Sequence, residues 1–267
     1  MNTGSNGKDC DTMPTILNLS FQMGEVLLEN GAEISRVQET MERVACAYRI
    51  DSFQVYVLTN AIFATGVEQG VERTAMLKHI PSTATHLGRI CAVNQLSREI
   101  VQGAHTVEEA SARLEEIRAL PYSPLPLAVL ACAVGSASFS YLFGGSWRDA
   151  AVAFVCGVAL ELFLSFVGRK GMSKFLTNLS ASALVTLCGG VFFLLGLGDN
   201  MDKIIIGSII RLVPGVALTN SIRDFFHGDY LSGAIRMLDA FLIGGCIAVG
   251  VGFVVRGLSM LTGGALL

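Results

Sequence analysis

A single arginine near the middle of an apolar run is the residue of this sequence whose chemistry is easiest to interpret. Arg211 stands in IGSIIRLVPGVALTNSIRD, residues 206–224, and Pro214-Gly215 follows within one turn. The guanidinium offers a planar fork of donors that fits a carboxylate, whereas proline removes a backbone donor and interrupts a helix. Interrupted helices line the substrate sites of many membrane transporters. The pattern predicts a substrate site made of Arg211, Pro214, Gly215, Thr219, Asn220, Ser221 and Asp224.

Two carboxylates, Glu161 and Asp239, stand in other apolar runs. A charge at the centre of a membrane costs on the order of 2.5 to 3.5 kcal/mol on insertion scales, so each should face a partner or a water-filled cavity. Together with Arg211 they predict an aqueous path, in which Glu161 and Asp239 are candidates for proton coupling. The alternative is a set of ion pairs between helices that only holds the bundle together.

The composition requires a membrane for the second half of the chain. Of the 267 residues, 52% are hydrophobic and 15% charged, and the mean hydropathy is +0.56. About 20 apolar residues are needed to cross the hydrocarbon layer as a helix. The sequence predicts five such spans, at 126–143, 149–168, 175–197, 203–222 and 231–256. Small residues at Gly244, Ala248 and Gly252 predict close helix contact along the last span.

The basic residues predict the orientation of these spans. Arg169, Lys170 and Lys174 cluster between the second and third spans, and such clusters stay in the cytoplasm. With five spans, the N-terminus is then cytoplasmic and the C-terminus external. The N-terminal segment is polar and has no signal-peptide pattern. We therefore expect a multi-pass protein of the cell (inner) membrane.

The first half of the sequence predicts a small α+β domain. Residues 1–124 contain ten basic and fifteen acidic residues, a net charge of −5. Helical periodicity is found at 15–29, 33–48, 85–103 and 107–119, and the period changes to two between residues 53 and 80. The predicted domains are a disordered N-terminus (1–14), a cytoplasmic α+β domain (15–120), a proline-rich linker (121–126) and a transmembrane domain (127–267). The fold class is thus an α-helical polytopic membrane protein with an N-terminal soluble domain.

No motif of catalysis or metal binding is present. His79, His86 and His105 are scattered, and no HExxH, GxSxG or phosphate-loop pattern surrounds them. The seven cysteines form no CxxC pair and are expected to be reduced. We expect no enzyme activity, no cofactor, no metal and no nucleic-acid partner.

A second motif lies at a predicted turn in the N-terminal domain. Glu33 and Arg36 follow directly on Gly31, a position that could bring them to a shared surface. The alternative is an ordinary solvated first turn of a helix.

Two stretches of the chain together resemble the threonine/serine exporter family. They are LLENGAEISRVQETMERV (27–44) and RLVPGVALTNSIRDFFHGDYLSGAIRMLDA (211–240). Full-length members carry about ten spans, so this chain is similar to the long component of the split form, whose enteric pair is associated with succinate export. The resemblance implies proton-driven efflux of threonine/serine-type amino acids or succinate-type dicarboxylates, with Arg211 as the anion clamp.

The same resemblance implies partners. They are the lipid bilayer, a short integral membrane subunit of the same family and a small carboxylate or amino-acid substrate; a second copy of the chain is a further possibility. Two readings from other classes compete with the exporter. One is a membrane-tethered, hydrolase-like enzyme, and the other is a sensor or assembly subunit that transports nothing. Charges inside several spans and a broken helix favour transport. Spans that only attach a protein to the membrane need neither feature.

Overall fold

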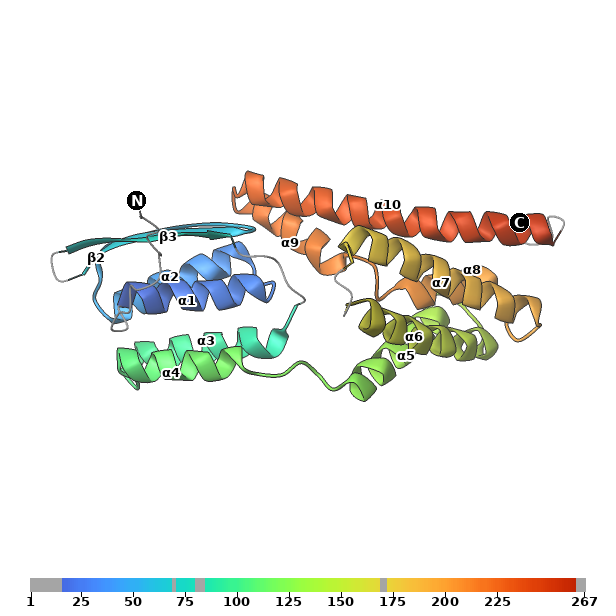
Figure 1. Ribbon diagram of the computed structural model, residues 1–267, viewed down its shortest axis with the longest axis horizontal. Coiled ribbons are helices and arrows are strands. Elements are labelled where there is room, and N and C mark those ends of the chain that lie inside the picture. The colour runs from blue at the N-terminus through green and yellow to red at the C-terminus, as the bar shows by residue number, and fades with distance from the viewer. Residues whose placement is uncertain (1–15, 69–70, 80–84, 169–171, 263–267) are drawn as a thin grey trace, which may run out of the picture. The chain divides into compact units, whose positions relative to one another are not determined.

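The computed structural model describes residues 16–68, 71–79, 85–168 and 172–262 (Figure 1). It divides into two compact units. The first comprises Met1–Tyr122 and Arg223–Gly233, and the second comprises Ser123–Ile222 and Ala234–Leu267. Three expectations fall on residues outside the described ranges: the disordered segment 1–14, the basic residues Arg169 and Lys170, and the C-terminal end.

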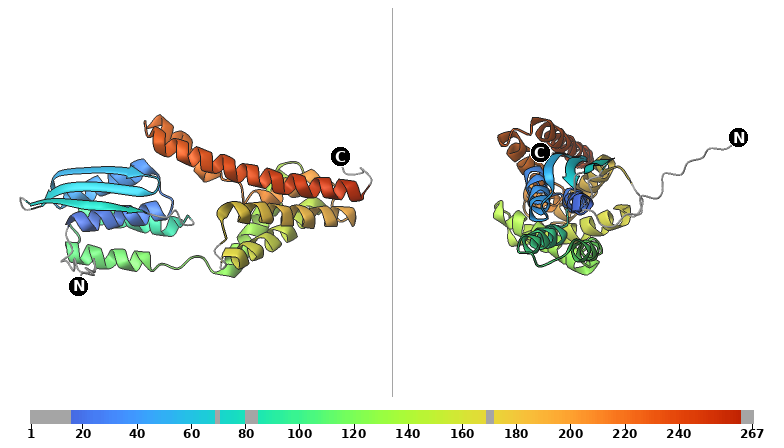
Figure 2. Two further views of the ribbon diagram at one scale, coloured as in Figure 1. Left: turned by 45° about the horizontal axis from the view of Figure 1, so that its top comes forward. Right: turned by 90° about the vertical axis from the view of Figure 1, so that its left-hand side faces the viewer.

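The N-terminal unit is built in three layers. Its elements are α1 (Ile16–Glu29), α2 (Ile34–Ala47), β1 (Asp51–Leu58), β2 (Ala61–Glu68), β3 (Val71–His79), α3 (Leu87–Val101) and α4 (Val107–Arg118). The three strands form an antiparallel sheet in the order β1-β2-β3. Helices α1 and α2 lie between this sheet and the pair α3 and α4 (Figures 1 and 2). The helices and strands expected from periodicity are all present.

The middle layer explains why α1 is apolar nearly all round. Leu19, Met23 and Leu27 of α1 are at most 1% exposed, because one side of the helix meets the sheet and the other meets α3 and α4. In α2 the buried stripe is narrower. Val37 and Met41 are fully buried while Glu39 and Arg43 pair on the outer side, as expected for an amphipathic helix.

The second unit contains the helices that are apolar and long enough to cross a membrane. Among the described residues there are four: α5 (Leu125–Leu142), α6 (Trp147–Gly168), α7 (Lys174–Leu194) and α10 (Tyr230–Leu261), whose first turn belongs to the N-terminal unit. The span expected at 203–222 is instead two short helices, α8 (Met201–Ile209) and α9 (Gly215–Phe226). Pro214 immediately precedes the second of them, so the interruption predicted at Pro214-Gly215 extends over residues 210–214.

Small residues let the helices of this unit approach closely. A Cβ on Gly157 of α6 would lie 2.9 Å from Cα of Ala133 in α5, and one on Gly207 of α8 would lie 2.6 Å from the backbone nitrogen of Ser140. Helix α5 therefore sits in grooves on both α6 and α8. The row on α10 differs, because Gly244 and Gly252 have no described atom within 4 Å of an added Cβ. The close contact expected there is not made within the described chain.

A buried carboxylate ties two connections of the second unit together. Asp149, in the first turn of α6, is fully buried. Its Oδ1 accepts hydrogen bonds from the backbone nitrogens of Asp199 and Asn200 (2.7 and 2.9 Å), and its Oδ2 accepts from Ser146 N and Asn200 Nδ2 (2.8 and 2.9 Å). The loop after α5 is thereby fixed to the loop after α7, and four donors are satisfied by one side chain.

We predict that Asp149→Asn destabilises the protein. An amide cannot accept at both former oxygens, so at least one buried N–H loses its partner at a cost of about 1 to 3 kcal/mol. Thermal unfolding in detergent measures the change. Asp202→Asn is the matched control, since Asp202 lies in the neighbouring first turn of α8, is 62% exposed and pairs only with the adjacent Lys203. Equal melting temperatures for the two variants would contradict the structural role of Asp149.

Candidate functional site

The interruption between α8 and α9 determines where Arg211 lies. Residues 210–213 form turns rather than a helix, with Leu212 N donating to Ile209 O and Val213 N donating to Ile210 O. Pro214 then starts the next helix, because its carbonyl accepts from Leu218 N. A proline suits this position, since it has no N–H to leave unsatisfied there. Arg211 therefore projects from irregular backbone between two helices.

Arg211 faces a carboxylate from a different helix. Its Nε lies 3.6 Å from Oε2 of Glu161 in α6, and the two side chains are 57% and 11% exposed. This separation is close enough for an ion pair but too long for a good hydrogen bond. Oε2 of Glu161 has no hydrogen-bond partner among the described residues. The charges of Arg211 and Glu161 balance each other, but Oε2 of Glu161 still lacks a hydrogen-bond donor among the described residues. A ligand with a donor group fits such a position.

The pair opens into a cavity of about 600 Å³. This volume lies in the usual range for small-molecule sites. Its polar lining includes Ser123, Ser136, Glu161 and Arg211, and most of the remaining wall is apolar. Ser136 is fully buried, and its Oγ also lacks a hydrogen-bond partner within the described chain. A cation, an anion and a hydroxyl thus border one cavity inside apolar helices.

Arg211 also borders a second cavity, of about 370 Å³. Here its neighbours are Lys174, Thr177 and Asn178 of α7, with Pro214 and Ile243 among the apolar wall. Nζ of Lys174 lies 2.6 Å from Oδ2 of Asp239 in α10. The first cavity is therefore lined by both members of an ion pair and the second by Lys174 alone of its pair, and Arg211 is common to both cavities.

The structure separates the residues expected in the substrate site into two groups. Arg211 and Pro214 line the cavities, and Glu161 joins them from α6. Gly215, Thr219, Asn220, Ser221 and Asp224 all lie along α9 and line neither cavity. The Thr219 hydroxyl instead donates to the carbonyl of Gly215. Asp239 lines neither cavity, but its ion-pair partner Lys174 lines the second one.

Sequence reasoning missed the other polar and sulfur-containing residues that line the two cavities. They are Ser123, Cys132, Ser136, Lys174, Thr177 and Asn178. For α7 the sequence did contain a signal. Lys174, Thr177 and Asn178 are polar residues near the start of a segment that is mostly apolar. Ser136 carried no signal, since serine is common in membrane helices and only the fold brings it to Glu161.

The N-terminal motif forms a contact of its own. Gly31 has a φ of +83°, which makes the tight turn between α1 and α2. Glu33 follows at the N-cap of α2, where Oε2 accepts from Arg223 at 2.7 Å and Oε1 from Ser35 at 3.0 Å. Burial raises the pKa of Glu33, but the hydrogen bonds from Arg223 and Ser35 outweigh it and leave the pKa below the ordinary value. Glu33 is thus engaged rather than solvated, whereas Arg36 is exposed.

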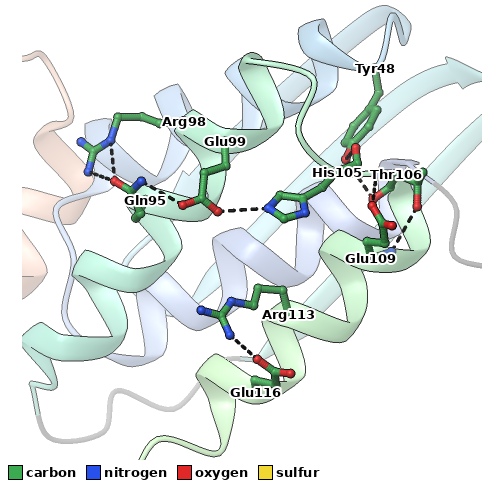
Figure 3. A network of polar contacts seen from close by, with 9 residues as sticks. All are labelled: Tyr48, Gln95, Arg98, Glu99, His105, Thr106, Glu109, Arg113 and Glu116. Atoms are coloured by element: carbon green, nitrogen blue, oxygen red, sulfur yellow. Dashed lines mark hydrogen bonds and ion pairs between the residues drawn. The ribbon is translucent and has the colours of Figure 1, made fainter.

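The described histidines of this unit serve structural roles. Figure 3 shows His105, whose Nε2 lies 3.0 Å from Oε2 of Glu99, while the hydroxyl of Tyr48 donates to the carbonyl of His105. His86 caps α3 by accepting from Arg89 N. No group of three possible metal ligands occurs among the described residues. His79 has a side chain outside the described set.

These features together define a class. Apolar helices of membrane-spanning length, an interrupted helix and a charged pair facing a cavity are the features of a polytopic helical membrane protein with an internal polar site.

Comparison with known proteins gives the family. A family profile described as a threonine/serine exporter (ThrE) matches residues 18–257, so the chain belongs to the threonine/serine exporter family. It is 28% identical to the threonine/serine exporter of Corynebacterium glutamicum over 89% of this chain and 50% of that protein. It is 26% identical to the probable succinate transporter subunit YjjP of Escherichia coli K12 over 88% of this chain and 92% of that protein.

The lengths of these relatives differ. The chain spans about half the length of the exporters it matches, which include one from Mycobacterium tuberculosis at 46% coverage. It spans nearly the whole length of the YjjP proteins. No solved structure gives a significant match. A family named for transport agrees with the expectation that the chain is not an enzyme.

We predict an asymmetric response of stability when the Arg211–Glu161 pair is broken. Arg211→Gln leaves the nearly buried Glu161 without a cation and should cost on the order of 2 kcal/mol, whereas Glu161→Gln leaves a half-exposed arginine and should cost less. The double variant E161Q/R211Q should recover most of the loss. Thermal unfolding in detergent of all four proteins gives the cycle, and simple additivity of the two losses would show that the pair does not interact.

Proposed function

We propose that the chain is one component of a secondary exporter for small metabolites that carry a carboxylate, and that Arg211 is the residue that holds the carboxylate. The substrates are threonine/serine-type amino acids or succinate-type dicarboxylates, in line with the names of its relatives. Export is driven by the proton gradient. The observation that carries the proposal is the Arg211–Glu161 pair in a cavity at an interrupted helix.

The incomplete pairing of Glu161 favours a role in coupling. A substrate carboxylate on Arg211 would draw the guanidinium away from Glu161 and so change the charge that Glu161 faces. Substrate binding and proton binding would then be linked through one arginine. Asp239 is the second candidate, because its partner Lys174 lines the other cavity beside the same arginine.

The two cavities favour different substrates. In the first, a cation and an anion are neighbours and Ser136 adds a hydroxyl, an arrangement that suits a zwitterion with a polar side chain, such as threonine or serine. In the second, Arg211 and Lys174 are both cations, an arrangement that suits a molecule with two carboxylates. We regard the first as the primary site, because its unsatisfied acceptors have no other partner within the described chain.

A separate membrane subunit completes this carrier in the proposal. Alternating-access carriers usually oppose two related bundles, and this chain spans only about half of the exporters it matches. The surface of α10 supports a partner. Gly244, Ala248 and Gly252 line an apolar groove of about 550 Å³ together with Val213 and Pro214. Small residues in such a row admit a neighbouring helix.

The segment 203–222 is the fifth span of the proposal, crossing as α8, the interruption and the first part of α9. With five crossings, the N-terminal unit is a soluble domain in the cytoplasm and the C-terminus is external, in a bacterial cell membrane. Lys174 at the start of α7 agrees with a cytoplasmic loop before that helix.

We predict that Arg211→Gln abolishes transport and that E161Q/R211Q does not restore it. The double variant leaves no unpaired charge, so it should reach the membrane at a normal level. It should still not transport, because the guanidinium that binds the carboxylate of the substrate is gone. Arg211→Lys should retain part of the activity, with a loss of about tenfold or more. The measurement is counterflow of labelled threonine, serine and succinate in proteoliposomes that contain the chain and a short membrane partner.

Three outcomes would each count against one part of the proposal. Normal transport by Arg211→Gln at normal abundance would remove Arg211 from the substrate site. Saturable transport by the purified chain alone would remove the need for a second subunit. Preference for succinate over threonine and serine would move the primary site to the cavity of Lys174.

Topology gives a further prediction. A reporter that is active only outside the cytoplasm should be active when fused after Leu267 and silent when fused after Ser123. A fusion at Asn200 is the reference, because the crossings of α5, α6 and α7 place the loop before α8 outside whether or not α8 and α9 cross, whereas Leu267 is external only if α8 and α9 together cross the membrane. Equal activity at Asn200 and Leu267 is expected, and a silent fusion at Leu267 alone would reduce the count to four.

A further inference from the structure

The two sequence motifs typical of this family meet at one ion pair. Arg223, in the second motif, donates to Glu33, in the first, and the side chain of Glu33 is only 11% exposed. Glu33 stands at the N-cap of α2, yet its carboxylate does not cap that helix. Its two oxygens accept from Ser35 and Arg223 instead. The carboxylate is therefore committed to a partner 190 residues away in the sequence.

Arg223 is well placed to transmit a restraint. Helix α9 starts at Gly215, directly after the interruption that carries Arg211, and reaches Arg223 two turns later, about 12 Å along its axis. The helix crosses the boundary of the two units, since Gly215–Ile222 belongs to the second and Arg223–Phe226 to the first. A contact that fixes Arg223 therefore also restrains α9, the helix that begins directly after the candidate site.

The turn after α9 extends the restraint to α10. Gly228 has a φ of +87°, and Asp229 N donates to Asp224 O, which closes the end of α9. Asp229 then accepts from Gly233 N at the start of α10. Only residues 227–229 separate α9 from α10, and backbone hydrogen bonds join the turn to both helices. Helix α10 carries Asp239, the partner of Lys174 at the second cavity.

We propose that the Glu33–Arg223 ion pair is a positioning contact through which the N-terminal unit controls access of water and substrate to the Arg211 site. The inference rests on the proposed function of that site. Neither residue touches the substrate. The pair holds α9 in one orientation, and its release frees α9 to change the width of the interruption at residues 210–214. The N-terminal unit thus acts as a regulator of the carrier rather than as an enzyme.

Native Cys132 provides a readout that needs no transport, because it lines the cavity of Arg211 and Glu161. In a background where Cys132 is the only cysteine, its rate of reaction with a membrane-impermeant maleimide is measured in wild type, Glu33→Gln and Arg223→Gln. We expect each single variant to change the rate by about fivefold or more, the lower end of typical coupling between sites. The exchanged pair E33R/R223E should return the rate to near the wild-type value.

Matched controls separate positioning from folding. Glu39→Gln breaks the Glu39–Arg43 pair, which lies further along α2 and stays within that helix, so it should leave the labelling rate unchanged. Arg223→Lys keeps the charge and should label at the wild-type rate. Glu33→Gln leaves no buried charge unpaired and should melt close to wild type in detergent, whereas Arg223→Gln leaves the nearly buried Glu33 without a cation and should melt lower. The labelling rate of Glu33→Gln is therefore the decisive one.

The outcomes are distinct from those of the transport test. Equal labelling in wild type and Glu33→Gln, or failure of the exchanged pair to restore the rate, would overturn the inference. Labelling changes that follow the ion pair, accompanied by parallel changes in counterflow, would support it. Absence of transport by wild type would contradict the proposed function, while the labelling rates would still decide whether Glu33 and Arg223 control the cavity.

Discussion

The requirement that buried polar groups be satisfied without water governs the second unit of this protein. A helix meets that requirement by itself, so every departure from helix inside an apolar bundle needs side chains to replace the lost bonds. At residues 210–214 the backbone leaves the helix, and the same segment brings Arg211 to Glu161. At Asp149 the requirement is met in full, because one carboxylate accepts four hydrogen bonds. The contrast between these two carboxylates distinguishes a structural anchor from a candidate site.

The sequence predicted the elements of this fold better than it predicted the composition of the site. Periodicity located the α+β elements of the N-terminal unit and the apolar helices, since both depend on which face of a segment is buried. The charges inside apolar runs and the break at Pro214 were visible for the same reason. The lining of the cavities was not, because Ser136, Thr177 and Asn178 become functional candidates only when α5, α6 and α7 bring them near Arg211. The polar residues of α9 were expected at the site from their closeness in sequence, yet they line neither of the two cavities.

Two ion pairs with nearly buried carboxylates lie within the N-terminal unit. Glu25 of α1 is 4% exposed and accepts from Arg118 of α4, a contact that joins two layers of that unit. The Glu33–Arg223 pair has similar geometry but a different consequence, because Arg223 lies on a helix that begins in the other unit. In both pairs a nearly buried carboxylate depends on its arginine, so loss of either arginine would leave a buried charge unpaired.

The length of α10 places a demand on the lipid. Its 32 residues extend for about 48 Å, whereas the hydrocarbon core of a bilayer is about 30 Å thick. Roughly 18 Å of helix must therefore be accommodated by tilt or by emergence into the headgroups and water. Tyr230–Gly233 belongs to the N-terminal unit, so part of the surplus lies at that end. A helix with such an excess changes its tilt when the membrane becomes thicker or thinner, and its turn with α9 would move with it. The geometry of this turn would then depend on the acyl-chain length of the lipids around α10.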